Sequence, residues 1–249
     1  MTRDELQRMY LAENTYWWFI GRRKLVRRLI QCTHTGQTGP GGDVLRILDI
    51  GCGTGGTLEA IADFGETWGA DISQDALDFC RERGLTRLKL CPAEKLDFDN
   101  ESFDVALSCD VLEHLEDDAP ALAEMKRILR PGGYGIITVP AHKWLWSSHD
   151  IALQHRRRYN AGELRAKLEA AGLGIVRFSY GVSLMFPALI GYRALRRILP
   201  GRKAPQTEFV RVPSVLRWVL LRMLDLEAAM VCRGVPLPPG ASLVAVVRK

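Results

Sequence analysis

Residues 47–56 read Ile-Leu-Asp-Ile-Gly-Cys-Gly-Thr-Gly-Gly, an apolar strand followed directly by a glycine turn and the start of a helix. Glycines let a backbone approach a ligand closely, and a helix N-terminus favours electron-rich groups. Asp71 lies twenty residues after Gly51, at the end of the next strand-like run. A carboxylate there can accept hydrogen bonds from both ribose hydroxyls of a nucleoside. The pattern therefore predicts a nucleoside site across the carboxyl ends of two neighbouring strands.

The same glycines also satisfy the dinucleotide-binding fingerprint, because Gly51, Gly53 and Gly56 follow the spacing Gly-x-Gly-x-x-Gly. A nicotinamide-dependent dehydrogenase is therefore an alternative. Asp49 argues against it, since a carboxylate two residues before the turn suits a cationic amino group better than a pyrophosphate.

Beyond this stretch the sequence alternates between strand-like and helix-like segments. Apolar runs rich in strand formers lie at 46–50, 67–70, 87–91, 103–109, 134–139, 175–180 and 242–247. Helical patterns lie at 57–63, 74–83, 119–129 and 160–171. Ser73 is a predicted N-cap, and Asn160 with Glu163 is a predicted capping box. This alternation predicts βαβ units and a mostly parallel sheet.

Several motifs in this order resemble those of the class I S-adenosylmethionine (SAM)-dependent methyltransferases. They are residues 48–55, Asp71, Phe103-Asp104-Val105, the Asp-Val-Leu-Glu-His run at 110–114 and the Leu-Arg-Pro-Gly-Gly run at 129–133. The resemblance covers roughly residues 45–180 and implies a Rossmann-like α/β fold with a seven-stranded, mostly parallel sheet. Its last strand, here 242–247, is expected to be antiparallel and to lie between the fifth and sixth. We expect a single domain with an N-terminal helical lid (1–40), a SAM-binding core (41–181), a helical insert (182–235) and the last strand (236–249).

The resemblance also implies which residues hold the methionine end of SAM. The main chain of Gly51, Cys52, Gly53 and Gly55 would cradle this part of the cofactor, with Asp49 near its amino group. Near the sulfonium, the lining residues would be Cys109, Asp110 and Val111.

At the adenosine end, Asp71 would bind the ribose and Ile72 would pack on the adenine. Ala93 and Glu94 would border the adenine edge. Many relatives carry an aspartate before this alanine, as acceptor for the adenine amino group. Here the residue is Pro92, so Glu94 or a backbone carbonyl would have to accept that hydrogen bond.

Candidate catalytic residues follow the fifth strand. Methyl transfer from a sulfonium is an in-line displacement that requires alignment, exclusion of water and, for an acidic acceptor, proton removal. We predict His149 or His155 as the general base, Asp150 as the group that orients the imidazole, and Tyr159 as a hydrogen-bond partner of the acceptor. A purely structural knot of these side chains is the alternative.

His114 is a second candidate base, with a supporting role behind the site as its alternative. We predict no metal site, because the spacing of His149 and His155 fits no common ligand motif, although a loop could still bring them together.

Two segments fall outside the strand–helix alternation. The first contains Trp17, Trp18 and Phe19 followed by Arg22 and Arg23, as in relatives that carry an N-terminal lid. Trp18 would then face the sulfonium, and Arg22 or Arg23 would pair with the SAM carboxylate. A helix that merely packs on the core is the alternative.

The second segment, 182–231, reads as two apolar helices separated by a stretch rich in Gly, Pro and charge at 200–213. A basic amphipathic helix can cover an apolar pocket or lie in a membrane interface. We therefore expect a small-molecule or lipid-like acceptor and treat peripheral membrane contact as an open possibility. Packing against the core alone would also explain these helices.

Composition and charge narrow the class of protein. Hydrophobic residues make up 47% of the 249, which excludes a disordered chain. The net charge is +4 over 1–40, −11 over 41–150, +4 over 151–190 and +8 over 191–249, so basic ends flank an acidic middle. The start of the chain shows no apolar signal region, and the six cysteines form no CxxC pair. We therefore expect reduced, buried thiols and a cytoplasmic protein, with contact at the inner membrane surface as the alternative.

The sequence thus predicts a SAM-dependent methyltransferase acting on a small or lipid-like acceptor. A nucleic-acid methyltransferase is less favoured, because the chain carries neither a recognisable RNA-binding module nor the Asn/Asp-Pro-Pro-Tyr motif used for flipped bases. A SAM-binding protein without catalysis is a third hypothesis. The acceptor, the atom that is methylated and the oligomeric state are left open by the sequence.

Overall fold

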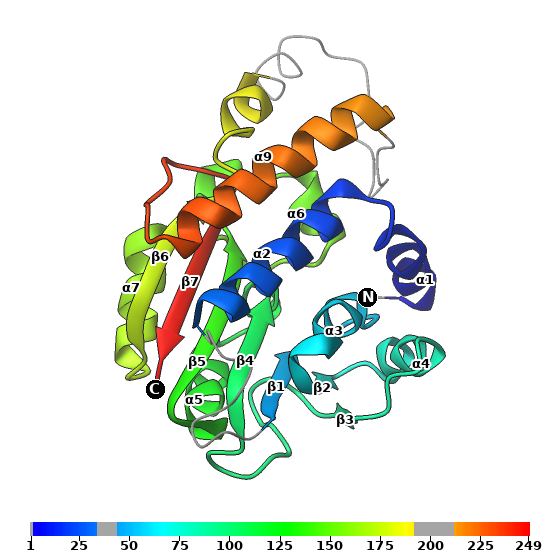
Figure 1. The fold of residues 1–249 in the computed structure, drawn as a ribbon, viewed down its shortest axis with the longest axis vertical. Coiled ribbons are helices and arrows are strands. Elements are labelled where there is room, and N and C mark those ends of the chain that lie inside the picture. Colours follow the sequence, from blue (N-terminus) through cyan, green and yellow to red (C-terminus); the bar gives the residue numbers. More distant parts are fainter. Residues whose placement is uncertain (1, 34–43, 192–211) are drawn as a thin grey trace.

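The computed structural model describes residues 2–33, 44–191 and 212–249, and its strands form one seven-stranded sheet in the order β3-β2-β1-β4-β5-β7-β6 (Figure 1). The strands are β1 (Leu45–Ile50), β2 (Gly65–Asp71), β3 (Leu88–Leu90), β4 (Phe103–Cys109), β5 (Leu129–Pro140), β6 (Gly174–Gly181) and β7 (Ser242–Arg248). β7 is antiparallel to both β5 and β6, and the other pairs are parallel. The predicted Rossmann-like sheet, with the last strand reversed between the fifth and sixth, is confirmed.

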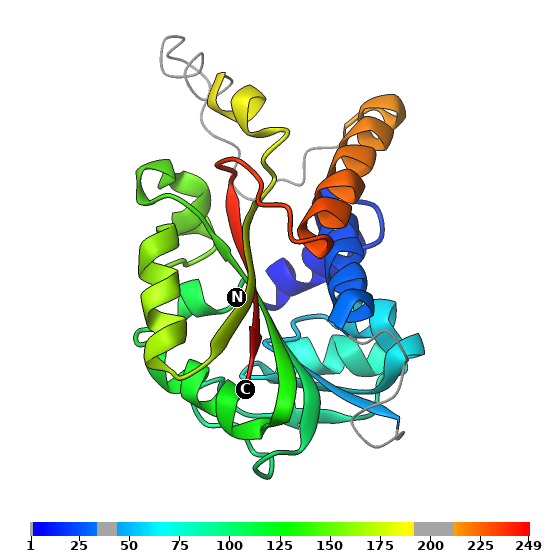
Figure 2. The same ribbon diagram turned by 60° about the vertical axis from the view of Figure 1, so that its left-hand side comes forward.

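Helices cover both faces of the sheet, as Figure 2 shows. One layer contains α5 (Ala119–Ile128) and α7 (Ala161–Ala170), and the other contains α2 (Trp17–Thr33), α3 (Gly56–Ile61) and α9 (Ser214–Cys232). β7 illustrates why both faces are covered. Leu243 and Ala245 pack toward α5 and α7, whereas Val244 and Val246 pack toward α2 and α9. A strand that is apolar on both sides must be buried on both sides.

The register of the parallel strands brings their carboxyl ends to one edge. Ile50 lies beside Ala70, and Cys109 lies beside Thr138. The segments that follow β1, β2, β4 and β5 therefore meet where the sequence predicts the site.

Of the two capping predictions made from the sequence, one is confirmed and the other is wrong. Ser73 caps α4 (Gln74–Glu82), since its hydroxyl accepts the Ala76 N–H at 3.3 Å. The predicted capping box at Asn160 is wrong, because the Asn160 side chain makes no capping bond to α7, although the helix does begin there. The Glu163 carboxylate instead lies 2.8 Å from the Lys143 ammonium.

The N-terminal segment is helical, as predicted, and lies against two parts of the molecule. α1 (Arg3–Ala12) packs on α4 through Leu6, Ala76 and Phe79. α2 lies beside α9 over the sheet (Figures 1 and 2), and Arg28 of α2 donates two hydrogen bonds to Asp225 of α9 at 2.9 and 3.0 Å.

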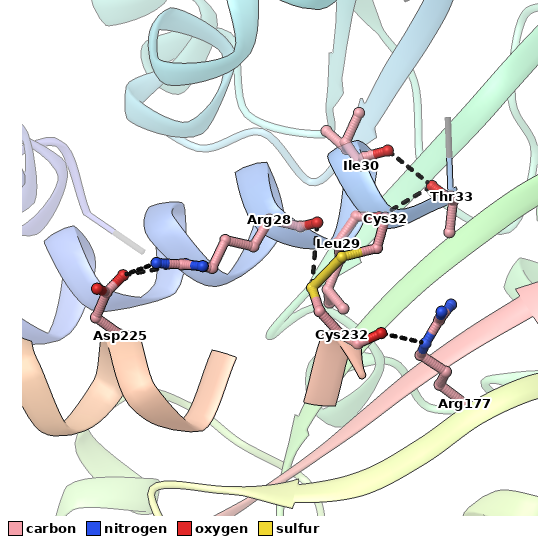
Figure 3. The surroundings of a disulfide bond; sticks show 8 residues. All are labelled: Arg28, Leu29, Ile30, Cys32, Thr33, Arg177, Asp225 and Cys232. Carbon is pink, nitrogen blue, oxygen red and sulfur yellow. Dashed lines mark hydrogen bonds and ion pairs between the residues drawn. A yellow bond between two sulfur atoms is a disulfide. The ribbon is translucent and has the colours of Figure 1, made fainter. Parts of the chain in front are cut away.

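Cys32 and Cys232 form a disulfide between the ends of α2 and α9 (Figure 3). The expectation of six free thiols is therefore wrong for this pair. The two residues are 200 positions apart in the sequence, and only the packing of α2 on α9 brings their Cα atoms to 5.9 Å. Spacing along the chain could not reveal this pairing. The other four cysteines are free and buried, as predicted.

Part of the predicted insert is described by the structure. Residues 186–191 are helical and α9 is a 19-residue helix, whereas residues 192–211 lie outside the described residues, as does 34–43. Among the helices that the structure describes, none is long and apolar enough to cross a bilayer.

Candidate cofactor and acceptor site

The glycine turn after β1 has a backbone shape that favours glycine. The φ angles of Gly51, Gly53 and Gly55 are +70°, +54° and +85°. The Gly51 N–H donates to the Ala70 carbonyl at 2.7 Å, which joins the turn to the end of β2. A Cβ atom added to Gly51 would lie only 2.5 Å from a methyl carbon of Val111. The glycines of the turn therefore present main-chain atoms without side chains, and the turn packs closely against the segment that follows β4.

Asp71 and Ile72 lie at the end of β2 beside this turn. The Asp71 carboxylate accepts the N–H of Gly53 at 2.9 Å through one oxygen and that of Ser73 at 2.8 Å through the other. Each oxygen keeps a further lone pair, so ribose hydroxyls can still bind. Ile72 is 74% exposed, which leaves an apolar surface next to the carboxylate. Ala93 and Glu94 are half-buried in the segment after β3.

Asp49 is a buried carboxylate near the turn, only 3% exposed. Burial raises its pKa to about 7, helped by the charges of Asp71 and Glu13 and opposed by Arg22. A carboxyl group with this pKa is near half-ionised at neutral pH and would be stabilised as the anion by a cationic ligand. This environment matches the predicted neighbour of an amino group.

Arg22 of α2 reaches the segment after β4. Its Nη1 donates to the Asp110 carboxylate at 2.7 Å, and the Thr138 hydroxyl donates to the other Asp110 oxygen at 3.2 Å. Arg22 Nε and Arg23 Nη1 are buried and have no hydrogen-bond partner among the described residues. The charge of Arg22 acts on Asp49, so its free N–H lies on the side of the turn where the carboxylate of an amino-acid ligand would bind.

Cys109 ends β4 as a buried thiol, and burial raises its pKa to about 12. It is therefore protonated at neutral pH and can line the site but not act as a nucleophile. Val111, two residues on, packs against Gly51. The glycine cradle, the buried Asp49 and the unpartnered N–H of Arg22 together fit SAM.

Glu13, at the C-terminal end of α1, is a contact that the sequence analysis missed. Its carboxylate accepts hydrogen bonds from the Thr54 hydroxyl at 2.7 Å and from Arg83 Nη2 at 2.6 Å. A Cβ atom added to Gly56 would lie 2.6 Å from this carboxylate. Glu13 thus fixes the end of α1 over the start of α3. No local pattern links these residues, which are up to 70 positions apart.

An apolar cavity of about 40 Å³ lies between α2, α9 and the ends of the central strands. Its apolar lining includes Trp18, Leu25, Leu224, Ala228, Val231 and Leu237. Its polar groups come from Arg22, Asp110, Thr138, Glu227 and Ser242. Glu227 accepts the N–H groups of Val182 and Leu184 at 2.7 and 2.6 Å, and burial raises its pKa. The cavity therefore borders Asp110, where the predicted SAM site ends.

Of the histidines predicted after β5, the structure brings His155 to Asp150. The His155 Nδ1 lies 3.1 Å from an oxygen of Asp150, which is fully buried. The same oxygen accepts a hydrogen bond from Arg158 Nε at 2.7 Å. His149 is instead exposed on α6 (Ser148–Ala152). Asp150 therefore orients the imidazole of His155.

Tyr159 has no access to an acceptor. Its side chain is fully buried, and its hydroxyl donates to Asp118 at 2.6 Å and approaches the Leu112 carbonyl at 3.1 Å. The prediction that Tyr159 binds the acceptor is wrong in this structure, because its hydroxyl is already engaged inside the core.

His114 lies beside His155, with ring centroids 4.9 Å apart and nearly perpendicular planes. Burial, together with the charge of His155, lowers the pKa of His114 to about 4. The adjacent Glu113 is fully buried, and the pKa of its carboxyl is raised by that burial and by Asp110. The structure thus brings together His114 and His155, which the sequence treated as separate candidates.

Comparison with known proteins agrees with the geometry. A family model described as "Methyltransferase domain" matches residues 48–137. A Mycolicibacterium smegmatis protein named "Probable S-adenosylmethionine-dependent methyltransferase" is 30% identical over 169 residues, which cover 66% of this chain and 62% of that protein. The "Ubiquinone/menaquinone biosynthesis C-methyltransferase UbiE" of Burkholderia mallei is 37% identical over 123 residues, 45% of this chain and 49% of that protein. The chain thus spans about half to three-fifths of the length of these relatives.

A solved SAM-dependent methyltransferase from Archaeoglobus fulgidus has the same fold, with a TM-score of 0.60 and 19% identity over 96% of this chain and 99% of the other. A phosphoethanolamine N-methyltransferase from Haemonchus contortus, solved in complex with SAM, aligns with a TM-score of 0.57 and 21% identity over 89% of this chain and 51% of the other. With the glycine turn, Asp49 and Asp71 in place, the chain contains a methyltransferase domain and is similar to class I SAM-dependent methyltransferases.

Proposed function

We propose that this protein transfers the methyl group of SAM to a small, largely apolar acceptor bound between α2, α9 and the ends of β4 and β5. The observation that carries the proposal is the apolar cavity that borders Asp110. Its lining from Trp18 to Leu237 would remove an apolar acceptor from water, and its polar groups are few. The similarity to UbiE proteins supports an acceptor with a quinone-like ring.

SAM supplies the electrophilic methyl group when bound, and the protein's own residues align it. The turn at Gly51 and Gly53 would hold the methionine end, Asp71 the ribose, and Arg22 the carboxylate. Trp18, at the wall of the cavity, would exclude water from the path between cofactor and acceptor. At about 40 Å³ the cavity is far smaller than the roughly 300–1,000 Å³ of most ligand sites, so the acceptor would have to part α2 and α9.

His155 and His114 are the candidate groups for proton removal. Asp150 fixes the His155 ring through Nδ1, which leaves Nε2 as the basic atom. His149, the other predicted general base, lies exposed on α6.

Labelled SAM tests the class of acceptor directly. Radioactive methyl-SAM is incubated with the protein and, in separate reactions, a short-chain reduced quinone, a total lipid extract and bulk RNA. Label should enter the organic phase of the first two reactions. Label recovered only in RNA would contradict the proposal.

Filling the cavity should affect the acceptor and spare the cofactor. Ala228→Leu adds three carbons to the cavity wall, so turnover of the best acceptor should fall at least about tenfold while SAM affinity stays unchanged. Leu226→Met, on the exposed side of the same helix, is the matched control. Equal turnover in both variants would place the acceptor elsewhere.

We further propose contact with an anionic membrane surface through the first half of α9. Val215 and Trp218 are 75% and 62% exposed, and Arg217 and Arg222 lie between and beside them. Exposed apolar side chains interleaved with cations suit an anionic lipid interface. The protein should float with phosphatidylglycerol vesicles at low salt, and the double variant Val215→Ser, Trp218→Ser should not. Flotation independent of these side chains, or its absence in the unaltered protein, would remove this part of the proposal.

A further inference from the structure

Glu113, His114 and His155 form a cluster beside the proposed site. Glu113 and His114 belong to the short helix η2 (Leu112–His114), and His155 comes from the loop after α6. Each offers one donor atom, and the three atoms lie within 4.8 Å of one another. Two imidazole nitrogens and one carboxylate oxygen make a common set of ligands for transition metals.

Glu113 is an unusual member of this cluster because its carboxylate is unsatisfied. The residue is 0% exposed, and neither carboxylate oxygen has a hydrogen-bond partner among the described residues. Buried carboxylates are normally paired or bound to a cation. The nearest candidate partner, His155 Nε2, is 4.0 Å from Oε1, which is too long for a hydrogen bond.

Asp150 orients His155 toward Glu113. A neutral His155 that donates from Nδ1 to Asp150 presents the lone pair of Nε2 to the cluster. Asp150 is itself held by Arg158 Nε at 2.7 Å and by the Ser147 N–H at 2.8 Å. A carboxylate behind a ligating histidine is the usual support of a metal site, since it fixes the ring and its tautomer.

We propose that Glu113, His114 and His155 bind one divalent transition-metal ion. Metal–ligand bonds of about 2.0–2.2 Å would draw the three donor atoms to roughly 3.4 Å from one another, a small movement from the present geometry. The nitrogen donors favour Zn²⁺, Co²⁺, Fe²⁺ or Mn²⁺ over Mg²⁺ and Ca²⁺, which prefer oxygen. Three protein ligands would leave at least one coordination position open.

The position of the cluster suggests what an ion there would do. Glu113 follows Asp110 by three residues, and the charges of Asp110 and Arg22 act on it. The ion would therefore lie next to the sulfonium end of the predicted SAM site. An acceptor hydroxyl bound at the open position would lose its proton more easily. With the ion bound, His114 and His155 would be ligands and not the base, and this role of the ion, unlike metal binding itself, rests on the proposed function.

Cobalt titration of chelator-treated protein tests the site without SAM or acceptor. The unaltered chain should bind one Co²⁺ and develop visible d–d absorption without the intense near-ultraviolet band of thiolate ligands. Glu113→Gln and His155→Ala should each weaken binding at least about 100-fold, because each removes a direct ligand. Glu116→Gln makes the same charge change at an exposed neighbouring position and should bind like the unaltered chain.

The thermal midpoint separates loss of a ligand from loss of the fold. Glu113→Gln keeps the side-chain shape and replaces a carboxyl group that burial makes hard to ionise with a neutral amide, so without metal its midpoint should stay close to that of the unaltered chain. Co²⁺ should raise the midpoint of the unaltered chain and leave that of Glu113→Gln unchanged. Equal Co²⁺ affinity in the two proteins, or thiolate absorption from the buried cysteines, would overturn the proposal. A SAM titration of the same samples shows separately whether the methyltransferase assignment holds.

Discussion

Replacing Gly51 with alanine should lower SAM affinity by about 100-fold or more. The residue has a φ of +70°, and a Cβ atom would lie 2.5 Å from a Val111 methyl carbon. The left-handed backbone costs about 1–2 kcal/mol for a residue with a side chain, and the overlap adds about 1–3 kcal/mol. The turn can relieve the overlap only by moving away from Val111, and this movement displaces the backbone that would hold the cofactor. A displacement of about 1 Å at a binding site can reduce function by about 100-fold. Isothermal titration calorimetry with SAM gives the affinity directly.

Gly84→Ala is the matched control for Gly51→Ala. Gly84 has a similar φ of +82°, but no atom lies within 4 Å of an added Cβ. This variant should lose about 1–2 kcal/mol of unfolding free energy from backbone strain and keep its SAM affinity. If Gly51→Ala binds SAM as well as Gly84→Ala does, the glycine turn is not the cofactor cradle.

SAM binding should also release a proton from Asp49. The pKa of this carboxyl is about 7 in the free protein, because burial disfavours its charge. A cationic amino group beside it stabilises the carboxylate and lowers the pKa in the complex. Affinity should therefore rise as pH increases from about 5 toward 7, approaching tenfold per pH unit, and level off above pH 7. Calorimetry in buffers of different ionisation enthalpy counts the released proton.

The stability of the free protein should change in the opposite sense. The unfolded chain holds the Asp49 proton only below about pH 4, whereas the folded chain holds it up to about pH 7. The folded state thus binds more protons between these values, so this residue makes unfolding easier as pH rises through that window. Asp49→Asn should reduce the pH dependence of the SAM affinity and that of the unfolding free energy. It should also weaken SAM binding at pH 8. If the SAM affinity of Asp49→Asn depended on pH as steeply as that of the unaltered chain, the released proton would come from another group.

Much of the fold was accessible from the sequence because its signals are local. Apolar runs that are buried on both faces, such as residues 243–247 of β7, show as continuous hydrophobic stretches whatever surrounds them. The glycine turn and Asp71 were accessible for the same reason, since strand ends and positive-φ positions are marked by residue type. The reversed last strand came from the family resemblance.

The features that were missed depend on residues far apart in the chain. Glu13 meets Arg83, and Cys32 meets Cys232, only after α1 and α9 have docked. The sequence predicts that Asp150 orients either His149 or His155, and the structure brings His155 to it. The approach of His155 to Glu113 requires the loop after α6 to fold back over η2. Tyr159 was misassigned because a tyrosine beside three arginines gives no sign of its complete burial.

The most direct test of the central claim is a crystal structure of the protein with S-adenosylhomocysteine. The ligand should lie along the turn at Gly51 and Gly53, with its ribose hydroxyls on Asp71, its adenine over Ile72 and its carboxylate toward Arg22. A ligand bound elsewhere, or a turn closed by the protein's own side chains under saturating ligand, would contradict the account.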